Sequence, residues 1–344
     1  MLGAILGLPE QVENAKRVSL RSDLAALPGR RYQSLLISGL GGSAIGGDLL
    51  HAGFQSQLNC PAVVVRDYHL PEYVNSETLV FATSNSGNTE ETLACYAAAR
   101  KARAAIVAFT TGGKLAELAQ ADGVPLVTFP GGLQPRAAVG YSFIPLIVCA
   151  ARLGLMPELL VDEIDEAAAV LRAVRDDCNP DVPQTHNEAK QLASVWRGKI
   201  PVIYGSQAER GVVAYRWKTQ INENAKAYAV WNVFPELNHN ETVGWSGGRD
   251  QGDVEKSLSL VVLRDDREPA QIRRRVDLTK QIIARRAAEI NEVWARGGGT
   301  LSRMLSLVYI GDFASYYLAM AYGEDPTPVR VIDWLKGQLA EAQP

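Results

Sequence analysis

The sequence predicts an α/β protein with two tandem halves, each a parallel sheet flanked by helices. Short apolar runs bounded by glycine or polar residues alternate with helix-like stretches, which is typical of parallel strands joined by helical crossovers. The alternation starts again at residues 199–206, after a region of helices and prolines. The 344 residues also leave room for about two domains of ~100–200 residues each. We therefore expect one domain at residues 1–153 and a second at residues 154–344.

The composition indicates a globular protein with neither a nucleic-acid nor a membrane partner. Hydrophobic residues make up 47% and charged residues 21% of the chain, and a net charge of −3 argues against a basic nucleic-acid surface. The apolar stretch at residues 1–8 is too short to cross a bilayer. The four cysteines have no metal-binding spacing, and we expect them as core residues in a reducing cytoplasm: Cys60, Cys95, Cys149 and Cys178.

The predicted elements follow from these apolar runs. A first helix is expected at residues 9–29, ended by Pro28 and Gly29. In the first half, strands are expected at residues 34–38, 62–65, 79–82, 104–109 and 124–129, a short helix at 114–120 and a longer apolar helix running to about residue 155. In the second half, two helices are expected within residues 156–198, strands at 199–206, 228–230 and 258–263, and a helix at 211–223.

A hydroxyl-rich loop at residues 84–89 lies between a predicted strand and a predicted helix. Free N–H groups and the positive end of the helix dipole make such a junction an anion site, and Ser84, Ser86 and Thr89 add three hydroxyl donors. The loop contains no lysine or arginine, so an anion would be held by neutral donors, which suits a phosphate monoester that must leave after turnover. The alternative is an ordinary capped helix, because Ser, Asn and Thr are also the preferred N-cap residues.

A second loop of the same kind follows the strand at residues 34–38, and three interpretations compete for it. Gly39, Gly41 and Ala44 fit a dinucleotide-binding fingerprint weakly, since the acidic Asp67 follows too far along the chain. A Walker P-loop is excluded because Gly-Lys-Ser/Thr is absent. The third interpretation is a sugar-phosphate site, in which Ser43 faces the hydroxyl loop across the carboxyl ends of adjoining strands.

Three further residues carry candidate chemistry. Arg136 follows a glycine and proline loop and precedes a buried-looking helix, so its partner is either a carboxylate in the core or an oxyanion on a substrate. Glu223 lies at a helix end in a polar segment, and His239 lies in a polar loop at residues 234–241. A carboxylate and an imidazole on separate segments suit a site that moves protons at carbon and at oxygen. The other histidines, His51, His69 and His186, are expected to be structural.

These segments together resemble the bifunctional phosphoglucose/phosphomannose isomerases, which are double sugar-isomerase-domain (SIS) enzymes of the phosphoglucose isomerase superfamily. The resemblance rests on five blocks in the family order, with a closing helix that ends in Lys336: residues 39–48, 84–92, 135–136, 222–226, 236–241 and 325–336.

The resemblance implies a role for each matched residue. Gly42, Ser43, Ser84, Ser86 and Thr89 would hold the 6-phosphate of a hexose. Glu223 would move a proton between C1 and C2 through a cis-enediol, and Arg136 would stabilise the charge on the enediolate oxygens. His239, with Lys336 nearby, would open and close the sugar ring. The resemblance also implies a homodimer in which His239 serves the neighbouring subunit's site, and a reaction without cofactor or metal.

Two alternatives stay open at the level of sequence. A non-catalytic regulator could bind a sugar phosphate in the same fold, although it would have no need for Glu223, Arg136 and His239 together. A related isomerase acting on another sugar phosphate would share the phosphate loops but would not be expected to carry the blocks around Glu223 and His239. The glycine-rich stretch at residues 244–253 follows His239, a position that suits a lid or a subunit contact.

Overall fold

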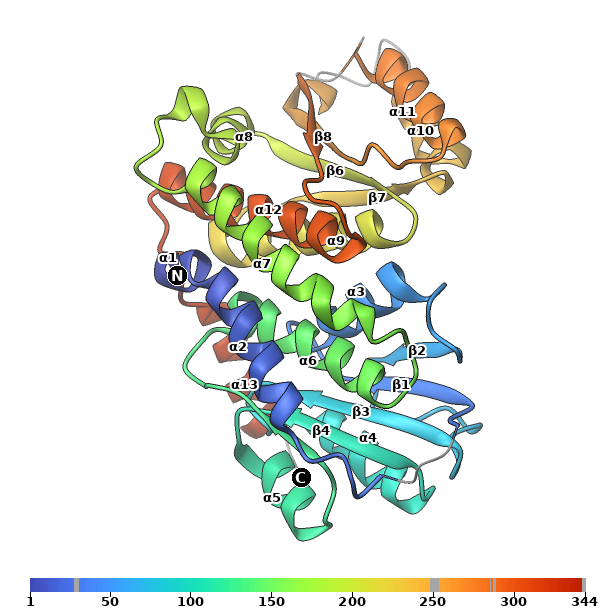
Figure 1. The fold of residues 1–344 in the computed structure, drawn as a ribbon. Coiled ribbons are helices and arrows are strands. Elements are labelled where there is room, and N and C mark those ends of the chain that lie inside the picture. Colours follow the sequence, from blue (N-terminus) through green and yellow to red (C-terminus); the bar gives the residue numbers. More distant parts are fainter. Residues whose placement is uncertain (28–30, 248–253, 285, 287–288, 342–344) are drawn as a thin grey trace.

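The computed structural model describes residues 1–27, 31–247, 254–284, 286 and 289–341. In this part of the chain the strands form two separate parallel sheets, one of five strands and one of four, and helices flank both. Figure 1 shows one sheet in each half of the molecule, with long helices between them. The predicted α/β fold with two parallel sheets is therefore confirmed.

The first sheet has the strand order β2-β1-β3-β4-β5, and every pair in it is parallel. Its strands are β1 (Ser34–Ser38), β2 (Ala62–Val65), β3 (Thr78–Ser84), β4 (Ala105–Thr110) and β5 (Leu126–Thr128). The predicted strands are confirmed to within a few residues. β3 and β4 are buried along their whole length, which explains why each is a continuous apolar run in the sequence.

The helices of the first half place the two polar loops at the carboxyl edge of this sheet. They are α1 (Leu2–Leu6), α2 (Leu8–Arg21), α3 (Ala44–Phe54), α4 (Glu90–Lys101), α5 (Gly113–Ala121), the 3₁₀ turn η1 (Pro135–Ala137) and α6 (Val139–Arg152). α3 follows the loop after β1, and α4 follows the hydroxyl loop after β3. The first helix ends at Arg21 rather than near residue 29, because Ser22 is extended and Asp23 accepts a hydrogen bond from the Ala25 N–H. Pro28 and Gly29 lie outside the described residues.

The second half repeats the arrangement with the strand order β7-β6-β8-β9. Its strands are β6 (Ile200–Ser206), β7 (Val230–Phe234), β8 (Leu258–Arg264) and β9 (Glu289–Trp294). Its helices are α7 (Leu159–Cys178), η2 (Gln184–His186), α8 (Glu188–Trp196), α9 (Glu209–Ala225), η3 (Glu236–His239), α10 (Glu241–Gly244), η4 (Val254–Ser257), α11 (Ala270–Ile283), α12 (Thr300–Tyr322) and α13 (Arg330–Glu341). The strand predicted at residues 228–230 is shifted, because Lys226 ends α9 in a left-handed conformation and pairing starts only at Val230. Of the glycine-rich stretch after His239, residues 248–253 lie outside the described residues.

The core between the two sheets is formed largely by α12. This helix packs against α7, α8 and α9 and is buried along most of its length (Figure 1). It is long and apolar enough to cross a membrane by composition alone, but 78% of its most apolar window is buried inside the protein, as expected of a core helix. Cys95, Cys149 and Cys178 are buried free thiols and Cys60 is half-buried, in agreement with their prediction as core residues.

Candidate active site

The loops after β1 and β3 meet at the carboxyl edge of the first sheet. The backbone N–H of Asn85 donates a hydrogen bond to Ser43 Oγ at 3.0 Å, and the hydroxyl of Thr83 donates to the Ser38 carbonyl at 2.8 Å. The two loops are neighbours because β1 and β3 are paired strands whose carboxyl ends lie side by side. This is the juxtaposition that the sugar-phosphate interpretation of the glycine loop requires.

The hydroxyl loop is folded around Ser84. Ser84 Oγ and Thr89 Oγ1 share a hydrogen bond of 2.8 Å, and the Gly87 N–H donates to Ser84 Oγ at 3.0 Å. Ser84 is 1% exposed, and its hydroxyl makes hydrogen bonds within the loop rather than with solvent. Ser86 is exposed and Thr89 is half-buried. Thr89 occupies the N-cap position of α4 without making a side-chain cap hydrogen bond. The ordinary capped-helix interpretation therefore does not describe this junction.

Gly42 brings the first loop against the segment that carries Arg136. A Cβ atom at Gly42 would lie 2.7 Å from the carbonyl carbon and oxygen of Pro135, closer than real side chains approach backbone. Glycine is therefore required for this contact. The contact between Gly42 and Pro135 places the two polar loops beside η1, which contains Arg136.

Arg136 is buried, with 4% of its side chain exposed, and it crosses from the first half of the chain to the second. Its Nε donates to Asn224 Oδ1 at 2.8 Å, and Nη2 donates to the carbonyl oxygens of Pro326 and Thr327, each at 2.7 Å. Glu223 Oε2 lies 3.4 Å from Nη1. Burial lowers the pKa of Arg136, and the nearby Glu223 carboxylate acts in the opposite direction. The sequence predicted either a carboxylate or a substrate oxyanion as the partner of Arg136. The carboxylate partner in the structure is Glu223, which is also the candidate base.

A buried polar network behind Arg136 was not predicted from the sequence. Asp312 on α12 accepts hydrogen bonds from Arg216 Nη2 at 2.9 Å and from Gln220 Nε2 at 2.7 Å. Arg216 Nη2 also donates to the Arg136 carbonyl at 3.0 Å, so the network holds the backbone of Arg136 in place. One signal in the sequence could have indicated this network: Asp312 is a single acidic residue in a long apolar stretch. A carboxylate buried in such a helix requires a hydrogen-bonding partner.

Glu223 faces an open cavity. Its side chain is 33% exposed and lines a space of about 810 Å³ between the end of α9 and the start of α13. Lys226 lines the same cavity, and its ammonium group donates to the carbonyls of Asn224 and Asp325. Burial, together with the charge of Arg136, lowers the pKa of Lys226. A carboxylate at the wall of this cavity, with a guanidinium beside it, has the geometry for proton transfer next to a developing oxyanion.

His239 and Lys336 do not join this group of contacts within one chain. His239 is exposed at the end of η3, and its imidazole makes no hydrogen bond or ion pair with any residue that the structure describes. Lys336 is exposed on α13, whose first residues line the Glu223 cavity. The structure therefore brings together Gly42, Ser43, Ser84, Ser86, Thr89, Arg136 and Glu223, and leaves the histidine and the lysine on the surface.

Comparisons with known proteins identify the family to which the chain is similar. Residues 185–339 match the family described as the bacterial phospho-glucose isomerase C-terminal SIS domain. The chain is 44% identical over 341 residues to the bifunctional phosphoglucose/phosphomannose isomerase of Caldicellulosiruptor bescii, covering 99% of both chains. It is 36% identical over 311 residues to that of Thermoplasma acidophilum, covering 90% of each.

The fold also matches solved structures. The C-terminal domain of glucosamine-fructose-6-phosphate aminotransferase from Francisella tularensis superposes with a TM-score of 0.75 at 15% identity, covering 95% of this chain and 98% of that one. This likeness shows the shared SIS-type fold. With the close sequence relatives, it leads to one conclusion: the chain belongs to the family of bifunctional phosphoglucose/phosphomannose isomerases.

Proposed function

We propose that the protein is an aldose–ketose isomerase that interconverts glucose 6-phosphate and mannose 6-phosphate with fructose 6-phosphate through a cis-enediol. This proposal rests on a continuous set of contacts between the loops and the candidate base. The hydroxyl loop contacts Ser43 of the glycine loop, Gly42 of that loop packs on Pro135, and the neighbouring Arg136 lies beside Glu223. One end of this set suits a phosphate group and the other suits proton transfer at a carbonyl.

At the phosphate end, Ser43, Ser86 and Thr89 would donate hydrogen bonds together with the free N–H groups of α4. Ser84 would stabilise the conformation of the loop, because its hydroxyl is hydrogen-bonded to Thr89 and to the Gly87 N–H. All these donors are neutral, so the phosphate is bound without a permanent ion pair and the product can dissociate. The charge of Arg136 remains available for the reacting end of the sugar.

At the carbonyl end, Glu223 would take the proton from C2 of an aldose phosphate, or from C1 of the ketose phosphate, and return it to the other carbon. The enediolate oxygens then carry negative charge, which the adjacent guanidinium of Arg136 stabilises. Glucose and mannose phosphates differ only at C2, so protonation of the enediol from either face would serve both. Asn224 and the carbonyls of Pro326 and Thr327 hold Arg136 in place before substrate arrives.

The remaining parts of the proposal concern assembly. We propose that the protein is a homodimer in the cytoplasm and that His239, with Lys336, opens the sugar ring, His239 acting in the neighbouring subunit's site. In support, the His239 imidazole is exposed and has no partner among the described residues of its own chain. α13 also exposes apolar side chains that a second subunit could cover, Val331, Trp334 and Leu335. The division into domains at residues 153 and 154 stays a prediction.

The test is to incubate the purified protein with fructose 6-phosphate, with and without a chelator, and to quantify both aldose phosphates. We expect glucose 6-phosphate and mannose 6-phosphate, formed at the same rate in both arms. Binding of fructose 6-phosphate without conversion would instead support a sugar-phosphate regulator. Conversion of a different sugar phosphate, with neither aldose formed, would indicate a related isomerase.

A further inference from the structure

A second cavity lies at the carboxyl edge of the second sheet. Its position corresponds to that of the glycine loop and the hydroxyl loop in the first sheet. β6 pairs with β7 and β8 in the same parallel order in which β1 pairs with β2 and β3. The loops after β6 and β8 therefore correspond to the loops after β1 and β3, where open α/β sheets bind their ligands. A cavity of about 190 Å³ lies between them.

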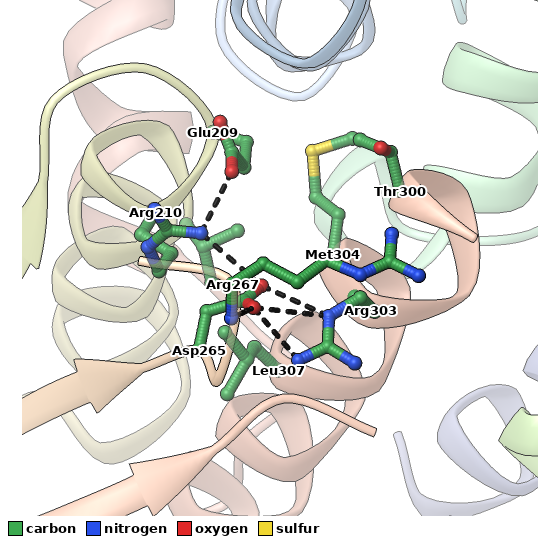
Figure 2. Close-up of a pocket in the computed structure, with 9 residues that line it drawn as sticks. Glu209, Arg210, Asp265, Arg267, Thr300, Arg303, Met304 and Leu307 are labelled. Atoms are coloured by element: carbon green, nitrogen blue, oxygen red, sulfur yellow. Dashed lines mark hydrogen bonds and ion pairs between the residues drawn. The ribbon is translucent and has the colours of Figure 1, made fainter. Parts of the chain in front are cut away.

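Three arginines from three different segments surround this cavity (Figure 2). Arg210 comes from the start of α9, Arg267 from the loop after β8 and Arg303 from the first turn of α12. Two carboxylates, those of Glu209 and Asp265, also line it. The lining itself thus has one more positive than negative side chain, and two carboxylates outside the lining, Asp266 and Glu268, form ion pairs with Arg303 and Arg210.

The carboxylates use only part of the donor capacity of these arginines. Arg303 is fully engaged, because it donates to Asp265, Asp266 and the Gly297 carbonyl. Arg210 donates through Nε to Ser206 and through Nη1 to Glu209 and Asp265, and its Nη2 makes no hydrogen bond with any described residue. Arg267 is exposed and donates only to the Gly298 carbonyl among the described residues.

The backbone adds to the positive potential of the cavity. Glu209 and Thr300, which both line it, are the first residues of α9 and α12, helices of 17 and 23 residues. The positive ends of two helix dipoles therefore meet where the arginines converge. Val213, Met304 and Leu307 add apolar side chains to the lining.

A purely structural ion-pair network would be expected to pair its guanidinium groups and to fill its space. Here Arg303 pairs with Asp265 and Asp266, and Arg210 pairs with Glu209, Asp265 and Glu268. A cavity nevertheless remains, with Arg210 and the exposed Arg267 at its wall. We propose that this cavity binds the phosphate group of a small molecule, as a second anion site in each chain. This inference goes beyond the proposed isomerase activity and does not depend on it.

The test is to titrate the full-length protein with inorganic phosphate at low ionic strength and to measure the number of bound anions by calorimetry. Wild-type protein should bind two phosphates per chain. Arg267→Gln should weaken one of the two sites by about tenfold or more, because a charge-assisted hydrogen bond is lost. Arg267→Glu should weaken the same site further. Arg274→Gln, an equal change of charge at an exposed position on α11, should change neither site.

Ser86→Ala in the hydroxyl loop separates this inference from the proposed function, since it should weaken only the other phosphate. The inference is overturned if neither Arg267→Gln nor Arg267→Glu weakens any bound phosphate. A single site per chain that both variants weaken would support the inference and would count against the hydroxyl loop. Two sites of which Ser86→Ala affects neither would instead count against the hydroxyl loop as a phosphate site. A parallel titration with fructose 6-phosphate distinguishes a sugar phosphate from free phosphate as the occupant of the second site. Urea unfolding of the Arg267 variants checks that they remain folded.

Discussion

At the scale of single residues, Arg136 shows how a buried charge can be kept for chemistry. A buried guanidinium is costly unless its N–H groups are satisfied. Asn224, Pro326 and Thr327 satisfy them with neutral oxygens, so the hydrogen bonds are made without cancelling the charge. The only carboxylate near it, among the described residues, is Glu223 at 3.4 Å, and that carboxylate is partly exposed. Among the described carboxylates, Glu223 alone therefore shares the charge of Arg136, and that charge can act on an oxyanion that develops beside Glu223.

Replacing Glu223 with glutamine should abolish isomerisation while leaving phosphate binding intact. The amide keeps the shape of the carboxylate but cannot accept a proton from carbon, so kcat should fall by about 10²-fold or more. The measurement is the steady-state rate with fructose 6-phosphate, together with calorimetric binding of the same compound. Glu324→Gln, a change of the same kind at an exposed position lining the same cavity, should retain most activity. Substantial turnover by Glu223→Gln would remove Glu223 from the mechanism.

Ser86→Ala should mainly raise KM. The exposed hydroxyl of Ser86 is expected to contact the phosphate in both the ground state and the transition state, so its loss weakens binding uniformly and leaves kcat close to the wild-type value. One hydrogen bond to a charged group corresponds to about a tenfold or larger increase in KM. A full Michaelis–Menten curve for each variant separates the two constants. A fall in kcat with unchanged KM would contradict this role.

At the scale of helices and strands, the sequence predicts the buried strands β1, β3 and β4 but misses the half-exposed strand β9 and the buried helix α12. β1, β3 and β4 are continuous apolar runs because both of their faces are covered. β9 was not predicted, since Glu289, Asn291 and Glu292 interrupt its apolar residues at the edge of the second sheet. Single loops could likewise be predicted as anion sites from the sequence, which stays a prediction. The network around Asp312 could not be predicted, because its members become neighbours only when α9 and α12 pack together.

The start of α12 gives a prediction about pH. Burial alone would raise the pKa of Glu166 on α7, but hydrogen bonds from the Gly298 N–H, the Ser302 hydroxyl and the Gly299 N–H lower it overall. A carboxylate whose folded pKa is lowered stabilises the fold above its ordinary pKa of 4.5, and this contribution is lost as pH falls through the folded value. Glu166→Gln should therefore reduce the free energy of unfolding by about 1 kcal/mol at neutral pH, as for other lost helix N-terminal caps.

Urea unfolding of both proteins between neutral and acid pH measures this difference. It should be constant above about pH 5.5 and should shrink as Glu166 becomes protonated in the folded wild type. Glu163→Gln on the same helix is the matched control, because burial and the neighbouring Glu166 raise the pKa of Glu163. That substitution should leave the protein equally stable or more stable at neutral pH. A stability loss for Glu166→Gln that persists unchanged at acid pH would contradict the capping explanation.

At the scale of the whole molecule, the candidate site combines both halves of the chain. The first sheet supplies the two loops proposed to bind phosphate, η1 supplies Arg136, and α9 of the second half supplies Glu223. Sequence reasoning identified these parts, but their proximity depends on the packing of α3 and α6 against each other and of α3 against α9. His239, which we propose opens the sugar ring, lies outside these contacts in one chain, because it is exposed beyond the carboxyl end of β7. A second subunit that presents its own His239 to this site would complete it.

Complementation between two inactive variants tests this arrangement. Chains carrying Glu223→Gln and chains carrying His239→Ala are co-expressed with different tags, and the heterodimer is purified through both tags in turn. If His239 serves the neighbouring subunit, one of the two sites combines an intact Glu223 with an intact His239, so the heterodimer should have about half the activity of the wild-type dimer. If His239 serves its own chain, every site lacks one residue and the heterodimer stays inactive. Doubly tagged Glu223→Gln homodimers measure the background, and recovery of monomers alone would refute the proposed assembly.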